Sequence, residues 1–224
     1  MGLLADILTK KRHEPSLIIG DKKAVSALET KEHARLLVVS DSHGNTERFI
    51  SIVKRYGSTC DALLFCGDGL SDIAGMFSAA HTDKELEKNI PPVLAFAQGN
   101  CDPRNVPGGL VAHLEQSLTV NGHKILIVHG HAHGVDYGLE KLGLQMRLNG
   151  YDIAFYGHTH IASEKRIENT AGDSPSEFKF VNPGSCARPR GGQPASLAIA
   201  TVEKTFIDIA FINAETFELW TPIT

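Results

Sequence analysis

The sequence predicts an α/β fold in which two packed β-sheets carry helices on their outer faces, and two patterns along the chain predict it. Over most of the chain, short apolar runs alternate with helical patterns, which is typical of βαβ units and parallel strands. In the last quarter, strand-like runs follow one another directly, which is typical of antiparallel structure. With 224 residues and a hydrophobic share of 42%, the chain suffices for one large core rather than two domains.

The first part of the chain is predicted to be an N-terminal extension, residues 1–34, followed by a single domain at 35–224. A short strand near residues 17–19 and a helix over 22–32 are expected there. A preceding short helix would have an apolar side. Its residues are Leu3, Leu4, Ile7 and Leu8. Packing on the flank of the domain is its simplest role, and docking to a partner or a membrane surface is the alternative.

Five short apolar runs have the length and composition of buried strands. They cover residues 36–39, 62–66, 93–97, 125–128 and 153–155. Each is followed by side chains that can bind a metal. A single Asp or His after a strand is more often a helix cap, but five such endings favour a common site. Because ligands bind at the carboxyl edge of α/β sheets, we expect these side chains to converge at one rim.

The segments between these runs predict the helices. Asn45 or Thr46 can cap a helix that ends at Gly57. A less regular helical pattern covers residues 71–88, where Asp72 is expected on the solvated surface. A further helix is predicted between residues 133 and 150.

The remaining segments predict antiparallel strands. Asn121-Gly122 predicts a type I′ hairpin between residues 117–120 and 123–128, because both turn positions favour positive φ. Strands are predicted at 164–168, 178–181, 196–202 and 206–212.

Composition narrows the class of protein. The formal net charge of -4 gives no electrostatic footprint for non-specific nucleic-acid binding. The four cysteines, Cys60, Cys66, Cys101 and Cys186, lack CxxC spacing, and we expect reduced thiols. Without a leader pattern or a run of about 20 apolar residues, a soluble cytoplasmic protein with no membrane contact is expected.

Together these motifs resemble the calcineurin-like metallophosphoesterase superfamily. They are, in order, Asp41-x-His43, Gly67-Asp68, Gly99-Asn100-x-Asp102, His129-Gly130-His131 and Gly157-His158-Thr159-His160. The Gly-Asn-Cys-Asp form and the loop at 182–185 resemble the small YfcE-like branch of prokaryotic phosphodiesterases, which is related in fold to the retromer subunit of that superfamily. The likeness covers roughly residues 35–212. It implies a four-layer αββα sandwich of two mixed β-sheets flanked by helices.

The resemblance also implies two divalent metal ions per chain. One would be held by Asp41, His43 and His160, the other by Asn100, His129 and His158, with Asp68 bridging them. Imidazole, carboxylate and amide donors without thiolate suit borderline cations. Mn²⁺ is the expected ion, with Fe²⁺, Ni²⁺, Zn²⁺ and Mg²⁺ as alternatives.

The activity that the resemblance implies is hydrolysis of a small phosphoester, foremost a phosphodiester, by hydroxide bridging the two ions. Asn100 and His131 are the candidate catalytic and substrate-binding residues. Arg188 is a candidate substrate contact, although an exposed surface arginine is the simpler interpretation. The alternative function is a non-catalytic protein-binding module on a phosphoesterase fold. A homo-oligomer is a further candidate.

Cys101 departs from the wider superfamily, in which many members have a His after Gly-Asn. A thiol with a pKa near 8.5 is a poor proton donor to a leaving alkoxide. We therefore expect diesters or esters with good leaving groups to be favoured, with low turnover on alkyl monoesters. The simplest role for Cys101 is nevertheless that of a small residue without a catalytic function.

Overall fold

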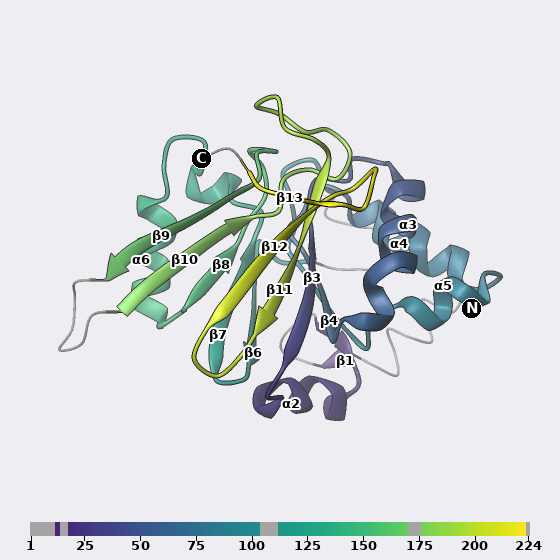
Figure 1. Cartoon of the computed structure of the whole chain (residues 1–224), viewed down its shortest axis with the longest axis horizontal. Coiled ribbons are helices and arrows are strands. Elements are labelled where there is room, and N and C mark those ends of the chain that lie inside the picture. The colour runs from purple at the N-terminus through teal and green to yellow at the C-terminus, as the bar shows by residue number, and fades with distance from the viewer. Residues whose placement is uncertain (1–11, 14–17, 104–111, 170–175, 223–224) are drawn as a thin grey trace.

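The computed structural model describes residues 12–13, 18–103, 112–169 and 176–222, and they form two β-sheets with helices around them (Figure 1). The larger sheet has the strand order β1 (Arg12–His13), β2 (Ile18–Gly20), β5 (Val93–Phe96), β4 (Ala62–Phe65), β3 (Ala34–Val39), β11 (Ser196–Val202), β12 (Ile207–Asn213) and β13 (Leu219–Trp220). The smaller has the order β6 (Glu115–Val120), β7 (His123–Val128), β8 (Ile153–Phe155), β10 (Ser176–Asn182) and β9 (Ser163–Asn169). Both sheets mix parallel and antiparallel pairs.

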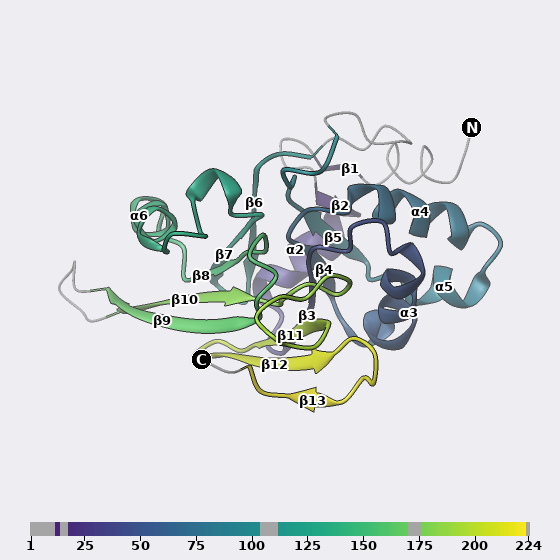
Figure 2. The same ribbon diagram turned by 90° about the horizontal axis from the view of Figure 1, so that it is seen from above.

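Among the described residues, all the helices except α2 (Lys22–Thr30), which lies at one end of the strands, cover the outer faces of the two sheets (Figure 1). The others are α3 (Thr46–Tyr56), α4 (Leu70–Ala80), α5 (Lys84–Asn89) and α6 (Glu140–Asn149), with short 3₁₀ helices η1 (Gly57–Thr59) and η2 (His131–His133). Figure 2 shows α3, α4 and α5 on one side of the sheets and α6 on the other. The predicted four-layer αββα arrangement is therefore confirmed.

The core consists of three apolar layers between these four. In β3, Leu36 and Val38 face the second sheet, where they pack with residues such as Phe155, while Leu37 and Val39 join the cluster under α3 and α4. A third cluster lies between the smaller sheet and α6. Burial of β3 on both faces, as its unbroken apolar sequence predicted, follows from its central place in the sheet.

The parallel strands run side by side within each sheet, and this places the site. In the larger sheet β3, β4 and β5 are parallel neighbours. In the smaller sheet β7, β8 and β10 are parallel neighbours. Because the carboxyl ends of parallel neighbours meet at one edge, the loops that follow these strands are brought together.

Local signals in the sequence account for several elements. Asn45 caps α3, since its side-chain oxygen accepts from the amide of Arg48 at 3.2 Å. The hairpin between β6 and β7 turns at Asn121 and Gly122, with φ values of 49° and 84°, which confirms the type I′ turn. Gly150, at φ 67°, ends α6 in the left-handed conformation.

The segment before residue 35 contributes to the larger sheet where it is described. β2 pairs with β5, and α2 places Leu28 in the cluster between the sheets. α2 precedes β3 and so lies at the opposite end of that strand from the loop at residue 41 (Figure 1). The predicted helix over residues 3–8 lies outside the described residues, and the domain division at residue 34 stays a prediction.

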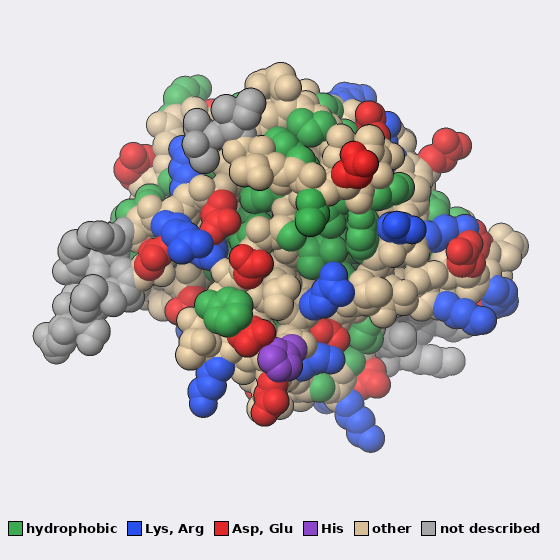
Figure 3. Space-filling model, viewed as in Figure 1, with side chains coloured by type: hydrophobic (Ala, Val, Ile, Leu, Met, Phe, Trp, Pro, Cys, Tyr) green, Lys and Arg blue, Asp and Glu red, His purple; other side chains and the backbone are tan. Residues whose placement is uncertain are grey.

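The surface mixes charges of both signs on the face seen in Figure 3, where acidic and basic side chains are interspersed. This agrees with the small net charge of the chain. Within the described ranges, no helix combines the length and apolar character that crossing a membrane requires.

Candidate metal centre

The loops after five strands bring the predicted metal ligands to one end of the two sheets. Asp41 and His43 follow β3, Asp68 follows β4, Asn100 follows β5, His129 follows β7, and His158 and His160 follow β8. Backbone hydrogen bonds join neighbouring loops within each sheet. The amide of Asp41 donates to Gly67 O at 3.0 Å, and the amide of Gly157 donates to His129 O at 3.1 Å.

Strained backbone is concentrated in these loops. Among the described residues, seven that are not glycine have positive φ. Five of them are Asp41, His43, Asp68, His158 and His160, with φ between 45° and 69°. Side chains disfavour this conformation, and its concentration at one place is typical of a functional site.

The motif glycines let the loops approach the carboxylates closely. A Cβ on Gly99 would lie 2.0 Å from Asp68 Oδ1, and one on Gly157 would lie 2.6 Å from Asp41 Oδ2 and 2.0 Å from Ser40 Oγ. No side chain fits at these distances. The glycines are therefore required by contact with the site.

Asp41 is fully buried and only one of its oxygens is satisfied. Oδ2 accepts from Ser40 Oγ at 2.6 Å and from the amide of His158 at 3.2 Å. Oδ1 has no hydrogen-bond partner, and it lies 3.3 Å from Nε2 of His160 and 3.7 Å from Nε2 of His43. A buried carboxylate oxygen without a donor is costly unless a cation faces it.

Asp68 lies between the two halves of the candidate site. Oδ1 accepts from the amide of Cys101 at 2.7 Å. Oδ2 lies 3.4 Å from Nε2 of His129 and 3.8 Å from Nε2 of His43. Burial alone would raise the pKa of Asp68, but the contact with His129 and the Cys101 amide hold that pKa well below its usual range.

Two of the histidines are oriented by backbone carbonyls. His129 Nδ1 lies 2.7 Å from Cys66 O, and His160 Nδ1 lies 2.6 Å from Arg188 O. Since a carbonyl only accepts, each Nδ1 carries a proton, and in the neutral ring Nε2 is the nitrogen with the free lone pair. These Nε2 atoms face Asp68 and Asp41 respectively, which is the arrangement of a metal-binding imidazole with a supporting partner.

The pKa is raised for two histidines of the centre and lowered for two others. Burial lowers the pKa of His129 and of His160, but Asp68 and Asp41 respectively outweigh it and raise both values. Burial lowers the pKa of His43 despite the nearby carboxylates. It also lowers the pKa of His131, with further lowering from neighbouring histidines, so its ring is neutral at pH 7.

Two carboxylates outside the ligand set hold the loops in place. Asp102 accepts from four amides, those of Asp68, Gly69, Leu70 and Gly99, at 2.8 to 2.9 Å. It thereby caps α4 from another loop, since Gly69 offers no side chain for this. The spacing of Asp102 from Asn100 belongs to the Gly-Asn-x-Asp motif, but the motif alone does not indicate that Asp102 caps α4.

The expectation that Asp72 lies on the solvated surface is wrong. Asp72 is fully buried, and it accepts from Ser42 Oγ and Thr46 Oγ1 at 2.5 Å each and from the amide of Gly44 at 3.0 Å. Its place on α4 faces the loop after β3, whose polar groups need an acceptor. Asp72 therefore supports the Asp41 loop as Asp102 supports the Asp68 loop.

The loop at 182–185 supports the same end of the sheets. Asn182 Nδ2 donates to Gly157 O at 2.9 Å, and Ser185 Oγ donates to Asp41 O at 2.7 Å. Both side chains are buried. The loop therefore ties the histidines after β8 to the carboxylate after β3.

The other predicted residues lie around this centre. Asn100 Oδ1 is 3.0 Å from Nε2 of His129. The ring of His131 lies 5.4 Å from that of His129, and its Nδ1 is buried without a hydrogen-bond partner. His158 Nε2 is 2.7 Å from Asp136 Oδ2, a contact that no sequence pattern indicated. Arg188 is exposed, and its carbonyl, rather than its guanidinium, contacts the centre.

Within the part of the chain that the structure describes, three groups of side chains have ligand atoms within 4.8 Å of one another. They are Asp41 with His43 and His160, Asp41 with Asp68 and His129, and His43 with Asp68 and Cys101. The first group contains the three residues expected at one ion, and the second combines Asp41 of that set with the expected bridge Asp68 and with His129 of the other set. His158 is in none of the three groups. The third includes Cys101, whose thiol pKa is raised to about 11 by Asp68 and, secondarily, by burial.

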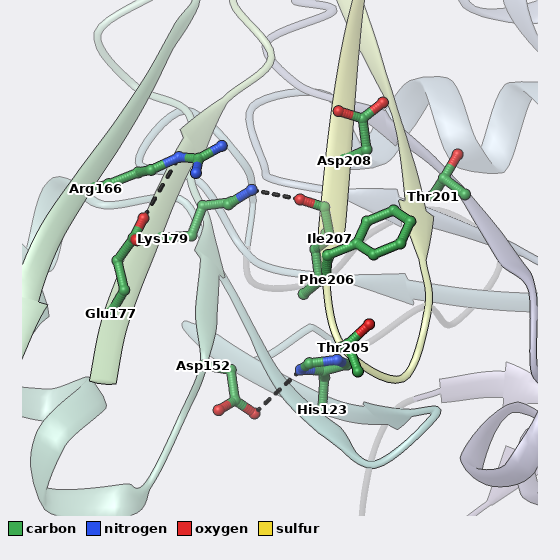
Figure 4. A pocket seen from close by; sticks show the side chains of 10 residues that line it. All are labelled: His123, Asp152, Arg166, Glu177, Lys179, Thr201, Thr205, Phe206, Ile207 and Asp208. Carbon is green, nitrogen blue, oxygen red and sulfur yellow. Dashed lines mark hydrogen bonds and ion pairs between the residues drawn. The ribbon is translucent and has the colours of Figure 1, made fainter. Parts of the chain in front are cut away.

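A separate cavity of about 570 Å³ lies between the sheets at the amino end of β8, and several of its charged side chains contact one another or the backbone (Figure 4). Arg166 is 3.4 Å from Glu177, and Lys179 donates to Ile207 O. The centre at the carboxyl ends is therefore the better candidate for chemistry.

Comparison with known proteins identifies the family. Residues 35–205 match the calcineurin-like phosphoesterase superfamily domain. The chain belongs to this superfamily. Within it, the chain is similar to the probable metallophosphoesterase YsnB of Bacillus subtilis, with 31% identity over 180 residues that cover 80% of this chain and 90% of that protein. It is also similar to the phosphodiesterase YfcE of Escherichia coli K12, with 28% identity over 176 residues that cover 72% and 84%.

Solved structures confirm the metallophosphoesterase fold. Vacuolar protein sorting 29 of Cryptosporidium parvum superposes with a TM-score of 0.62 over 84% of this chain and 95% of that one, at 16% identity. At this identity the likeness concerns the fold.

The residues of this phosphoesterase domain fit divalent metal ions. The unsatisfied Oδ1 of the buried Asp41 needs a cation, and Nε2 of His129 and Nε2 of His160 face the carboxylates of Asp68 and Asp41 respectively. Oxygen and imidazole donors are those that borderline divalent ions prefer. The centre therefore has the chemistry of a metal site.

Proposed function

We propose that this protein is a metal-dependent phosphodiesterase that holds two divalent ions on either side of Asp68. The observation that supports this most is the position of Asp68 Oδ2, between Nε2 of His43 and Nε2 of His129. Asp41, His43 and His160 would hold one ion, and Asn100, His129 and His158 the other. When bound, such ions supply a water of lowered pKa as nucleophile and neutralise charge on the phosphate.

The remaining residues of the centre would bind and orient the phosphoester. The amide group of Asn100 faces the second ligand set and can donate to a phosphate oxygen. His131 is neutral at pH 7, so its ring has one N–H with which to stabilise charge that develops on an oxygen. The exposed guanidinium of Arg188 is placed to meet an anionic group at the rim.

The weak acidity of the Cys101 thiol favours phosphodiesters as the substrate class. With its thiol pKa near 11, it is no acid for a leaving group at neutral pH. Substrates with good leaving groups need no such acid. We therefore propose aryl diesters and similar phosphodiesters rather than alkyl monoesters as the substrate class. Mn²⁺ as the ion and a cytoplasmic location belong to the same proposal.

The experiment is hydrolysis of bis(4-nitrophenyl) phosphate by the metal-free protein after addition of Mn²⁺, and again after EDTA. We expect turnover only with Mn²⁺, and its loss in Asp68→Asn. Asp152→Asn is the matched control, because Asp152 lies beside His123 at the far cavity. Full activity of Asp68→Asn would refute the bridging role.

The second candidate is a non-catalytic protein-binding module, which the fold likeness to vacuolar protein sorting 29 favours. It keeps the same ligand residues but predicts no turnover. Two bound ions without hydrolysis of any of several diesters would favour this module. A homo-oligomer stays a prediction, which sedimentation can test.

A further inference from the structure

We propose that Asp136 is a positioning residue for the second metal ion, because its carboxylate holds Nε2–H of His158 and leaves Nδ1 of that ring to bind the ion. This inference rests on the proposed function. Asp136 belongs to none of the motifs that identify the superfamily.

The geometry of the pair carries the inference. His158 Nε2 lies 2.7 Å from Asp136 Oδ2, the distance of a charge-assisted hydrogen bond. The backbone of His158 is held as well, since its amide donates to Asp41 Oδ2 at 3.2 Å. The ring lies beside the centre, with its centroid 5.1 Å from that of His129. With Nε2 engaged, Nδ1 is the nitrogen left for a metal.

His158 differs from the other two supported histidines in its partner. His129 and His160 donate Nδ1–H to backbone carbonyls and turn Nε2 inward. His158 instead has a side-chain carboxylate at Nε2. A carboxylate makes the imidazole a stronger electron donor than a carbonyl does. Asp136 would therefore fix the tautomer of His158 and strengthen its bond to the ion.

The fold places Asp136 on the loop that also carries His129. Val135 packs tightly on Gly130, where an added Cβ would lie 2.7 Å from Val135 Cγ2. The amide of Tyr137 donates to Gly134 O at 2.9 Å, which closes a tight turn around Asp136. One loop after β7 thus contributes a ligand and the support for a second ligand that follows β8.

The competing interpretation is an ordinary ion pair without influence on metal binding. His158 and Asp136 side chains are 22% and 44% exposed, and pairs at such exposure contribute little to stability. That interpretation predicts no change in metal affinity when Asp136 is removed. The two interpretations therefore differ in a quantity that can be measured without substrate.

The test is titration of the metal-free full chain with Mn²⁺, in which binding is measured by calorimetry and by competition with a chelator. In Asp136→Ala we expect one of the two ions to bind about 10- to 100-fold more weakly, with the other within about twofold of wild type. Asp136→Asn keeps an acceptor oxygen and should fall between. Asp152→Ala is the control, since Asp152 is 3.8 Å from His123 in the far cavity. Unchanged affinity for both ions in a folded Asp136→Ala protein would overturn the proposal.

A double-mutant cycle with His158→Ala tests whether Asp136 acts through that ring. We expect His158→Ala to weaken the same ion, and Asp136→Ala to add no further loss in that background. Equal losses in both backgrounds would show that Asp136 acts elsewhere, and the proposal would be wrong. Nitrogen-15 NMR should show Nε2 of His158 protonated in wild type, a preference that Asp136→Ala loses.

The wild-type titration separates this inference from the proposed function. Binding of two ions that Asp136→Ala leaves untouched would reject the role of Asp136 and leave the metal centre standing. Failure of wild type to bind any ion would reject both.

Discussion

Replacing Asp102 by Ala should destabilise the fold more than an ordinary helix-cap substitution. Its Oδ1 accepts from the amides of Gly69 and Leu70, and its Oδ2 from those of Asp68 and Gly99. A hydrogen bond to a charged group contributes about 1.5–3 kcal/mol net. Asp102 is half-buried, so water can reach part of the vacated space, and we expect a loss of about 4 kcal/mol rather than the full sum.

The assay is urea unfolding followed by circular dichroism, with the free energy of unfolding taken from midpoint and slope. Asp21→Ala is the control, because Asp21 caps α2 through a single amide, that of Lys23, and should cost about 1 kcal/mol. Asp102→Asn keeps one acceptor oxygen and should cost about 2 kcal/mol. A loss for Asp102→Ala no larger than that for Asp21→Ala would show that the four amides do not depend on this carboxylate.

Three further predictions follow from the same contacts. Gly99→Ala should abolish Mn²⁺ binding, because the added Cβ would lie 2.0 Å from Asp68 Oδ1. Gly143→Ala, on α6, is the control and should bind Mn²⁺ as the wild type does. Equal Mn²⁺ affinity of the two variants would contradict the close approach of Gly99 to Asp68. Asp72→Ala should lower the free energy of unfolding by about 3 kcal/mol, because three donors, among them the buried hydroxyl of Ser42, lose their acceptor. Urea unfolding measures this, and a change below about 1 kcal/mol would count against a supporting role for the buried Asp72. Mn²⁺ at 100 times its dissociation constant should raise the free energy of unfolding by about 2.7 kcal/mol per ion, and EDTA should remove this gain. A melting temperature that does not change when Mn²⁺ is added would mean that the folded protein binds no ion.

Local patterns in the sequence predicted the elements well, because the elements depend on local physics. The apolar run at residues 36–39 is continuous since β3 is covered on both faces, and the Asn121-Gly122 turn follows from the conformations these residues tolerate. The separate endings of the strands predicted a shared rim because parallel strands in one sheet share an edge. The structure brings Asp41, Asp68 and His129 together there.

Local sequence patterns did not predict the residues that hold the ligand loops in place. Asp72 has the sequence context of a surface helix, and only the approach of a loop 30 residues earlier makes it a buried acceptor. Asp136 likewise meets His158 across 22 residues of chain. The contact of His160 with Arg188 is made by the backbone carbonyl of Arg188, which side-chain patterns do not indicate. Such contacts depend on tertiary placement, which residue types and spacing do not specify.

The most direct test of the metal centre is a crystal structure of the full chain grown with Mn²⁺, with ions located by their anomalous scattering. We expect two peaks, one beside Asp41 and His160 and the other beside His129, with the carboxylate of Asp68 between them. No peak at this end of the sheets, or peaks that Asp68 does not contact, would contradict the proposed function.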